Sequence, residues 1–437
     1  MTARLRKFVY ALKEAFWLVP GAMVLGGILL AVAFVQLDRS GMIPDALLKS
    51  AWLYNGGGTG ARTLLGAIAS STIGVAGTVF SITIASLSLA AGQMGPRLLR
   101  NFTHDRGNQF TLGAFLGTFS YALMVLRTVR THDEGVFVPH ASLSFGIFLA
   151  FICVATLVYF VDHIAGRINV DTVIDLVSDD IRSSLQRLTT DVSPPAVPEQ
   201  DWHGAKLVTD DRRGYLQQLD QEGLADWAAE HGAMVQLLVR PGDFVFPGAP
   251  IGLLKPDVDG IEDAVRAATA LGMQRVNSSD LEFAVRQLVE VAVRALSPGI
   301  NDPNTAISVL ERLGTALCEM TGRSFPASNV QREGRTVLTF RQFDYDGLTD
   351  VMFHMIRQNA AGSAAVLIRI IEILTVVATC EKDPDRIKAL SRHAALVLAD
   401  AERTVPTPDD LRDVRQRYTF FTNVRTSGLI GALAMKG

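Results

Sequence analysis

Small and hydroxylated residues recur along one uncharged segment of the chain, between Arg62 and Arg97. They follow one another at alternating spacings of four and three residues, which places them on one stripe of a helix. Hydroxyls and exposed backbone on such a stripe can replace part of an ion's hydration shell, as in a pore wall. Small residues also let two helices pack closely, so packing is the alternative. The stripe consists of Ser70, Gly74, Gly77, Ser81, Ala85, Ser88 and Gly92.

Arginines stand at both ends of this segment, with Arg62 before it and Arg97 and Arg100 after it. Positive charge at the mouths of a pore favours anions through its electrostatic field. Basic residues at the inner end are also what membrane topology requires. The arginines therefore give only a weak preference for anions.

A second candidate site lies in the sequence Ala-Leu-Ser-Pro-Gly-Ile-Asn-Asp-Pro-Asn-Thr-Ala at 295–306. Asp302 is a natural N-cap there, with proline at the first helical position. The start of a helix alone explains Asp302 and Pro303. Asn301, Asn304 and Thr305 are left over at a helix N-terminus, where anions can bind. Asn301, Asp302, Asn304 and Thr305 together form either a ligand site or a structural motif.

Other chemistry is not indicated. The chain has no H-E-x-x-H, G-x-S-x-G or P-loop motif, and its three cysteines lack a metal-ligand spacing. We therefore expect no enzyme, no cofactor and no metal. The formal net charge is -3 and there is no long basic run, so a nucleic-acid partner is not expected.

Four long apolar runs lie in residues 1–165, which we expect to form a transmembrane domain. They cover about 16–37, a part of 63–94, 110–126 and 141–164, and a bilayer core needs about 20 apolar residues in a helix. The second run has 34 uncharged residues and would be about 51 Å long as a helix. It must therefore tilt, break or project from the membrane. Basic residues before the first run, between the second and third, and after the fourth put both termini in the cytoplasm.

The rest of the chain has the charge density of a soluble protein, so the fold class is α-helical membrane protein with a mostly helical cytoplasmic α+β domain. Residues 166–259 are expected to hold a helix that continues the fourth span, a proline-rich linker and a small β module; 260–437 are expected to be mainly helical. Within the module, 216–229 favours a helix, and 234–239 and 244–245 favour strands. Glu282 and Arg286 are expected on an ion-paired solvent face of a later helix. The apolar segment 360–380 is expected to be a buried helix in which Arg369 and Glu372 pair.

The chain resembles a bacterial family of predicted membrane proteins designated a domain of unknown function. The resemblance covers nearly the whole chain and rests on the hydroxyl-rich second span, on Arg240-Pro-Gly-Asp-Phe-Val245, and above all on the LSPGINDPxTA signature at 296–306. One departure is Ser279-Asp280-Leu-Glu282-Phe283, where the family has a Gln-Asp-x-Glu-Phe pattern. The resemblance implies a bacterial inner-membrane protein and supplies no activity.

Two functions fit these features. The first is a homo-oligomeric ion channel or channel-like transporter, because symmetric assembly of four-span chains around one helix produces a pore. The second is a membrane-anchored sensor or scaffold whose large domain binds a ligand or a protein. A hydrated stripe favours the channel, and a dry stripe favours the sensor or scaffold.

Overall fold

The structure is a computed structural model that describes residues 16–40, 54, 56–94, 105–130, 137–194, 200–275 and 281–435. It divides into two compact units, Met1–Thr172 and Val173–Gly437. We call them the membrane unit and the second unit, and each is described by itself.

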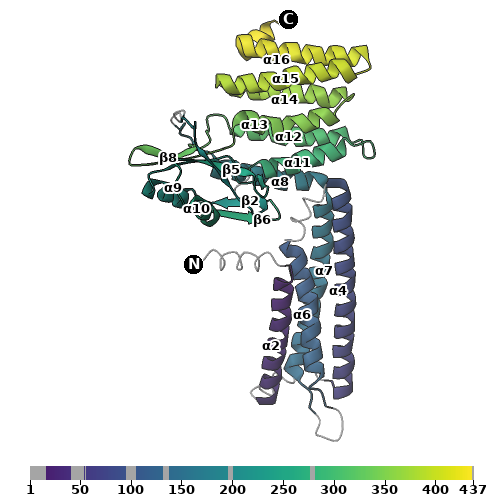
Figure 1. Cartoon of the computed structure of the whole chain (residues 1–437). Helices are drawn as coiled ribbons and strands as arrows, with labels where there is room; N and C mark the ends of the chain where they lie inside the picture. Colours follow the sequence, from purple (N-terminus) through teal and green to yellow (C-terminus); the bar gives the residue numbers. More distant parts are fainter. Residues whose placement is uncertain are drawn as a thin grey trace. The chain divides into compact units, whose positions relative to one another are not determined.

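The membrane unit is a bundle of four long helices (Figure 1). Among the described residues, these four are the helices long and apolar enough to cross a membrane, which confirms the expected number of spans. The third contacts the other three and is the most buried. The helices are α2 (Leu18–Ser40), α4 (Gly58–Met94), α6 (Arg106–Leu126) and α7 (His140–Ile168).

Helices α2 and α6 pack through glycines. A Cβ on Gly27 would clash with the backbone of Gly117, and a Cβ on Gly117 would lie 2.9 Å from the carbonyl oxygen of Met23. The Gly113-x-x-x-Gly117 spacing therefore serves close packing within the chain.

Asp38 and Tyr121 fix one end of this bundle. The Asp38 carboxylate accepts hydrogen bonds from the backbone nitrogens of Ala141 and Ser142, both at 3.0 Å. It thereby caps the N-terminus of α7, where negative charge is favoured. The buried Tyr121 hydroxyl donates to the carbonyl oxygen of Ser142 at 2.8 Å.

Helix α4 is one unbroken helix of 37 residues, about 55 Å long at 1.5 Å per residue. The second span was expected to tilt, break or project from the membrane, and a break in the helix is therefore wrong. The helix exceeds a hydrocarbon core of about 30 Å and has to tilt or project.

The expected continuation of α7 into the next helix is wrong. Helix α7 ends at Ile168, and Asn169 is extended, with φ -68° and ψ 124°. Helix α8 (Val170–Leu188) then begins, and the Asn169 side chain accepts from the backbone nitrogen of Asp171. Its apolar face, which includes Val173, Val177 and Ile181, is buried as its helical spacing predicts.

The β module contains two sheets and two helices. A five-stranded sheet has the order β1-β5-β3-β8-β7, and a three-stranded sheet has the order β4-β2-β6. Strand β8 pairs in parallel with β3, although about a hundred residues separate them in sequence. The elements are β1 (Lys206–Thr209), β2 (Gly214–Leu219), α9 (Gln221–Glu230), β3 (Met234–Leu237), β4 (Phe244–Val245), β5 (Pro250–Lys255), α10 (Ile261–Ala268), β6 (Thr269–Gly272), β7 (Asn329–Arg332) and β8 (Arg335–Phe340).

The module confirms the strands expected at 234–239 and 244–245 and corrects the expected helix at 216–229. Residues 214–219 form β2, whose two sides pair with β4 and β6. The helix begins only after Asp220, whose side chain accepts from the backbone nitrogen of Gly223. An N-cap aspartate therefore marks the true start of the helix.

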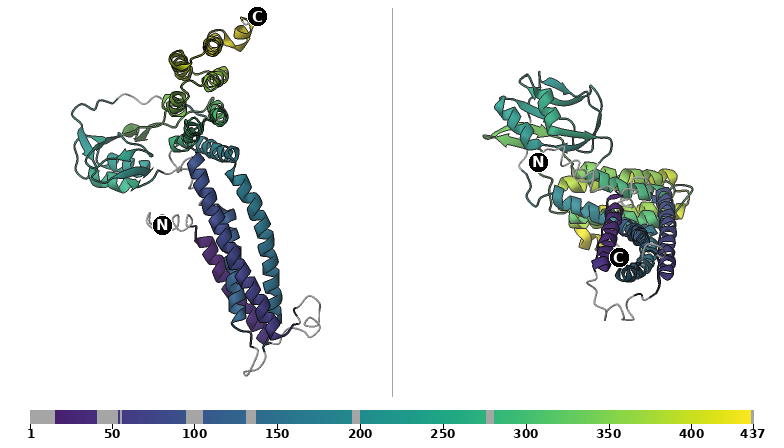
Figure 2. Two further views of the ribbon diagram at one scale, coloured as in Figure 1. Left: turned by 90° about the vertical axis from the view of Figure 1, so that its right-hand side faces the viewer. Right: turned by 90° about the horizontal axis from the view of Figure 1, so that it is seen from below.

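The remaining helices form a helical stack in which α11 to α16 follow one another in chain order (Figure 1); a second view shows them as successive layers (Figure 2). As expected, α14 is buried in this stack and Arg369 pairs with Glu372 at 3.1 Å. The stack consists of α11 (Leu281–Ala295), α12 (Pro303–Glu319), α13 (Tyr345–Asn359), α14 (Ala364–Cys380), α15 (Pro384–Thr404) and α16 (Pro408–Ala434).

Candidate functional site

The stripe of small residues lies on the uncovered face of α4. Ser70, Gly74, Gly77, Ser81, Ala85 and Ser88 are all exposed in the membrane unit. The buried residues of α4 lie on the opposite side of the helix at 3.6 residues per turn. They are Ala61, Leu65, Ile68, Ala69, Thr72, Ala76 and Val79.

Among the described residues, the glycines of the stripe make no close contact with another helix. A Cβ added to Gly74 or Gly77 would meet no atom within 4 Å among the described residues. This contrasts with Gly27 and Gly117, where the chain does use glycine for close packing. The glycines of the stripe are therefore not explained by close packing among the described residues of the chain.

Large apolar side chains flank the stripe on both sides. Phe80 and Ile84 are exposed on one flank, and Ile82 and Leu89 on the other. From Phe80 to Leu89 no residue is buried. This end of α4 presents a small, hydroxylated face between two apolar borders.

The stripe hydroxyls bond to their own helix. The Ser81 hydroxyl donates to the carbonyl oxygen of Gly77 at 2.9 Å, and the Ser70 hydroxyl donates to Ala67 at 3.2 Å. The outward side of each oxygen can still accept, and a hydroxyl can rotate to donate outward. The stripe can therefore replace waters around an ion of either sign.

Of the three arginines that flank the uncharged segment, the structure describes only Arg62. Arg62 is exposed near the start of α4, about 100° around the helix from the middle of the stripe. Arg97 and Arg100 lie outside the described residues.

Near the end of α7, His163 pairs with the N-cap residue of α6, Asp105. Its Nε2 lies 2.5 Å from the Oδ2 of Asp105, and Asp105 accepts from the backbone nitrogen of Gly107 at 2.9 Å. His163 thus connects α7 to α6.

The four candidate residues of the LSPGINDPxTA signature, Asn301, Asp302, Asn304 and Thr305, come together at the start of α12. Asp302 accepts from the backbone nitrogens of Asn304 and Thr305 at 3.1 and 3.2 Å, and from the Thr305 hydroxyl at 2.6 Å. Asn301 has a left-handed conformation, with φ 48°. The Asp302 carboxylate occupies the position that an external anion would take, which supports the structural interpretation.

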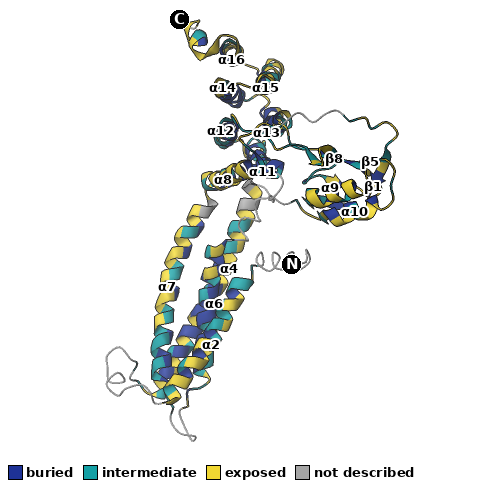
Figure 3. Ribbon diagram, turned by 90° about the vertical axis from the view of Figure 1, so that its left-hand side faces the viewer, coloured by how far each residue is buried: buried dark blue, intermediate teal, exposed yellow. Residues whose placement is uncertain are grey.

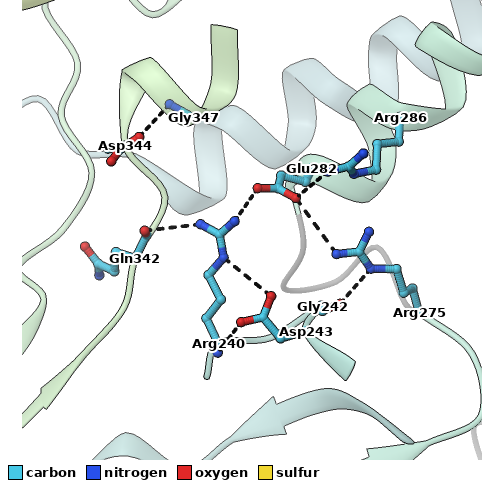
Figure 4. Close-up of polar contacts among 9 residues, drawn as sticks. All are labelled: Arg240, Gly242, Asp243, Arg275, Glu282, Arg286, Gln342, Asp344 and Gly347. Atoms are coloured by element: carbon cyan, nitrogen blue, oxygen red, sulfur yellow. Dashed lines mark hydrogen bonds and ion pairs between the residues drawn. The ribbon is translucent and has the colours of Figure 1, made fainter. Parts of the chain in front are cut away.

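Glu282 is the center of an ion-pair network, which corrects its expected place on a solvent face. It is buried, and it pairs with Arg240, with Arg275 at 3.9 Å and with Arg286 at 3.4 Å. Figure 4 shows these arginines converging on Glu282 from different segments. Arg240 also donates to the carbonyl oxygen of Gln342 at 3.2 Å. The network joins the β module to α11. Spacing along the helix reveals only Arg286, because Arg240 and Arg275 lie outside α11.

A second polar cluster in the helical stack was missed from sequence. Asp350 and His354 on α13 meet His393 on α15. His393 is fully buried, and burial lowers its pKa to about 4, with the nearby Arg392 adding to the effect. Its imidazole is therefore neutral near pH 7. The only local signal was the spacing of four between Asp350 and His354, which is common in helices.

Comparison with known proteins identifies relatives over nearly the whole chain. The family model described as "Predicted membrane protein (DUF2254)" matches residues 13–376. The chain is 30% identical over 428 residues to "Uncharacterized protein MT1328" of Mycobacterium tuberculosis (strain CDC 1551 / Oshkosh), covering 94% of this chain and 80% of that protein. The same identity and coverage hold for "Uncharacterized protein Mb1321c" of Mycobacterium bovis (strain ATCC BAA-935 / AF2122/97). No solved structure matches.

Proposed function

The chain belongs to the predicted membrane protein family DUF2254, and from that premise we propose that it forms a homo-oligomeric ion channel or channel-like transporter lined by α4. The observation that carries this proposal is the exposed stripe of Ser70, Gly74, Gly77, Ser81, Ala85 and Ser88, opposite the face that α4 buries within its own chain.

Symmetric assembly explains both the stripe and its borders. If copies are arranged around an axis with α4 innermost, the stripe faces the axis and lines a path. The flanking Phe80 and Ile82 then lie where neighbouring copies meet, and their apolar side chains seal the wall. One chain with four spans would not enclose such a path alone.

The arginines set the ion preference in this proposal. The stripe itself carries no charge, so its hydroxyls select neither sign. Arg62 adds positive potential at one end of α4, which favours anions. We place the protein in the bacterial inner membrane with both termini in the cytoplasm, because the basic residues gather at the inner ends of the spans. No catalytic chemistry is part of the proposal.

The second candidate is a membrane-anchored sensor or scaffold in which the stripe only holds copies together. It is favoured by the absence of charge on the stripe and by the size of the second unit, Val173–Gly437. The two candidates differ in whether water reaches the stripe.

Cysteine accessibility in liposomes separates the candidates. In a background with Cys153, Cys318 and Cys380 replaced by serine, Ser81→Cys is treated with a charged thiol reagent. The matched control is Ala155→Cys, an exposed position on a different helix, α7. Figure 3 shows many exposed residues along α7. A channel predicts labelling of the first variant and not of the second, because a thiolate forms only in water. Equal protection of both would favour the sensor or scaffold.

A further inference from the structure

Three metal-ligating side chains converge between α13 and α15 of the helical stack. Asp350 and His354 lie four residues apart on α13, so both side chains project from one face. His393 comes from α15. The Nε2 of His354 lies 2.8 Å, and the Nε2 of His393 3.1 Å, from the same Oδ1 of Asp350. The three ligand atoms all lie within 4.8 Å of one another.

We propose that Asp350, His354 and His393 bind a divalent first-row transition-metal ion of the zinc class. Tetrahedral coordination with bonds of about 2.0–2.1 Å separates ligand atoms by about 3.3 Å. The two separations from Asp350 Oδ1, 2.8 and 3.1 Å, need only a small expansion to reach that value. A site of this kind, built from facing helices, is a recurrent way for helical proteins to hold metals.

The ligand types select the class of ion. Two imidazoles and one carboxylate suit zinc, cobalt and iron, whereas magnesium and calcium prefer sets of oxygen ligands. His393 is fully buried, with its ring 5.5 Å from that of Phe353. A neutral buried imidazole is the form that ligates metal. Its Nε2 lies 3.1 Å from Asp350 Oδ1 and 3.5 Å from Arg392 Nη2. Coordination through Nε2 places the ring proton on Nδ1, which has no hydrogen-bond partner among the described residues.

Arg392 holds the same carboxylate and would compete with the metal. Its Nη2 lies 2.5 Å from Asp350 Oδ1 and 2.8 Å from Asp346 Oδ1. The Arg392 side chain is 37% exposed, so it can leave for solvent. The carboxylates of Asp346 and Asp350 would then face the incoming positive charge. Removing Arg392 should therefore tighten metal binding.

Contacts that the ligands make in the structure must change when the metal binds. The Nδ1 of His354 accepts from Arg357 Nη2 at 3.3 Å. Coordination through Nε2 places the ring proton on Nδ1, so this hydrogen bond is lost. Arg357 keeps its buried pairing with Asp400. Three metal bonds therefore replace the contacts from Arg357 and Arg392 and the two histidine contacts with Asp350 Oδ1.

The test uses cobalt as a spectroscopic probe on the full-length protein, purified in detergent without a histidine tag. Cobalt(II) is titrated at pH 7.5 and its visible ligand-field absorption is recorded, followed by competition with zinc and with excess magnesium. The variants are His354→Gln, His393→Gln and Arg392→Gln. The control is His203→Gln, which changes an exposed histidine of the β module.

We expect one cobalt ion per chain, displaced by zinc and not by magnesium. His354→Gln and His393→Gln should each weaken binding by at least about tenfold, Arg392→Gln should strengthen it, and His203→Gln should leave it unchanged. His354→Gln keeps the test decisive if the variant of the buried His393 fails to fold, because His354 is partly exposed. The proposal is overturned if Arg392→Gln binds no cobalt, or if His354→Gln binds it as tightly as the wild type.

Discussion

The backbones of Gly27 on α2 and Gly117 on α6 are in direct contact, and any side chain on Gly27 would overlap Gly117. The same kind of residue on α4, Gly74, faces away from every described part of its chain. Gly27 therefore lies in a close helix contact and Gly74 in open space, and alanine substitution at each position tests this difference.

Gly27→Ala is expected to destabilise the membrane unit, because its Cβ would overlap backbone that cannot move aside as a side chain can. Overpacking of this kind costs about 1–3 kcal/mol. Gly74→Ala should be neutral or stabilising by up to about 1 kcal/mol, since alanine is the better helix former and the space is open. Thermal unfolding of both variants in detergent measures the difference. Equal melting temperatures would contradict the assigned contact.

The membrane spans could be predicted from sequence because a bilayer imposes one simple requirement, a long uncharged helix. The β module was harder. Strands β1, β6 and β7 have only four residues each, and β8 joins β3 from about a hundred residues away. Hydrophobic patterning reports on neighbours along the chain and not on such pairings.

In the candidate sites, too, the sequence predicted local features and missed contacts between distant residues. The spacing of the stripe correctly placed it on one face of α4, and Asp302 was correctly read as an N-cap, because both are local properties. Glu282 was misplaced because the cations that neutralise it include Arg240 and Arg275, which lie outside its helix. His393 joins His354 only through the packing of α15 on α13.

Removing the Glu282 carboxylate should strongly destabilise the second unit. Glu282→Ala leaves Arg240, Arg275 and Arg286 without their common partner, and breaking a buried ion pair costs about 3–5 kcal/mol. The control is Glu222→Ala, which removes an exposed partner of Arg332 and should cost at most about 1 kcal/mol. Urea unfolding followed by tryptophan fluorescence compares them. A similar loss in both variants would show that the Glu282 network adds nothing beyond a surface pair.

The Asp302 cap should give a pH-dependent contribution to stability. Hydrogen bonds from the Thr305 hydroxyl and from backbone N–H groups hold the pKa of Asp302 below its usual value. Because the folded pKa is the lower one, the contribution is fully present above the unfolded pKa of about 3.9 and is lost as pH falls through the folded pKa. Asp302→Asn keeps a capping side chain that does not titrate.

The free energies of unfolding of wild type and Asp302→Asn should therefore differ by a constant amount from pH 5 to 8. In more acidic solution the wild type should lose stability relative to Asp302→Asn. Measuring both proteins side by side at each pH cancels the titration of all other groups. A difference that does not change below about pH 4 would mean that the carboxylate is not held by these hydrogen bonds.

Arg62 should set the ion preference if the protein conducts. Arg62→Gln removes positive charge at one end of α4, so the reversal potential in a salt gradient should move toward cation selectivity. Arg39→Gln, at the exposed end of α2, is the control for a charge outside the proposed path. An unchanged reversal potential in Arg62→Gln would remove the argument for anions and leave the pore itself untouched.

The most direct test of the central claim is ion flux through the purified protein in liposomes, comparing wild type with Ser81→Leu, Ser88→Leu and Ala155→Leu. All three substitutions put leucine at an exposed position of the membrane unit, and only the first two lie on the stripe. The account predicts flux in the wild type and in Ala155→Leu, and its loss in both stripe variants with the oligomer intact. Wild-type flux that persists in Ser81→Leu and Ser88→Leu would contradict a pathway along α4.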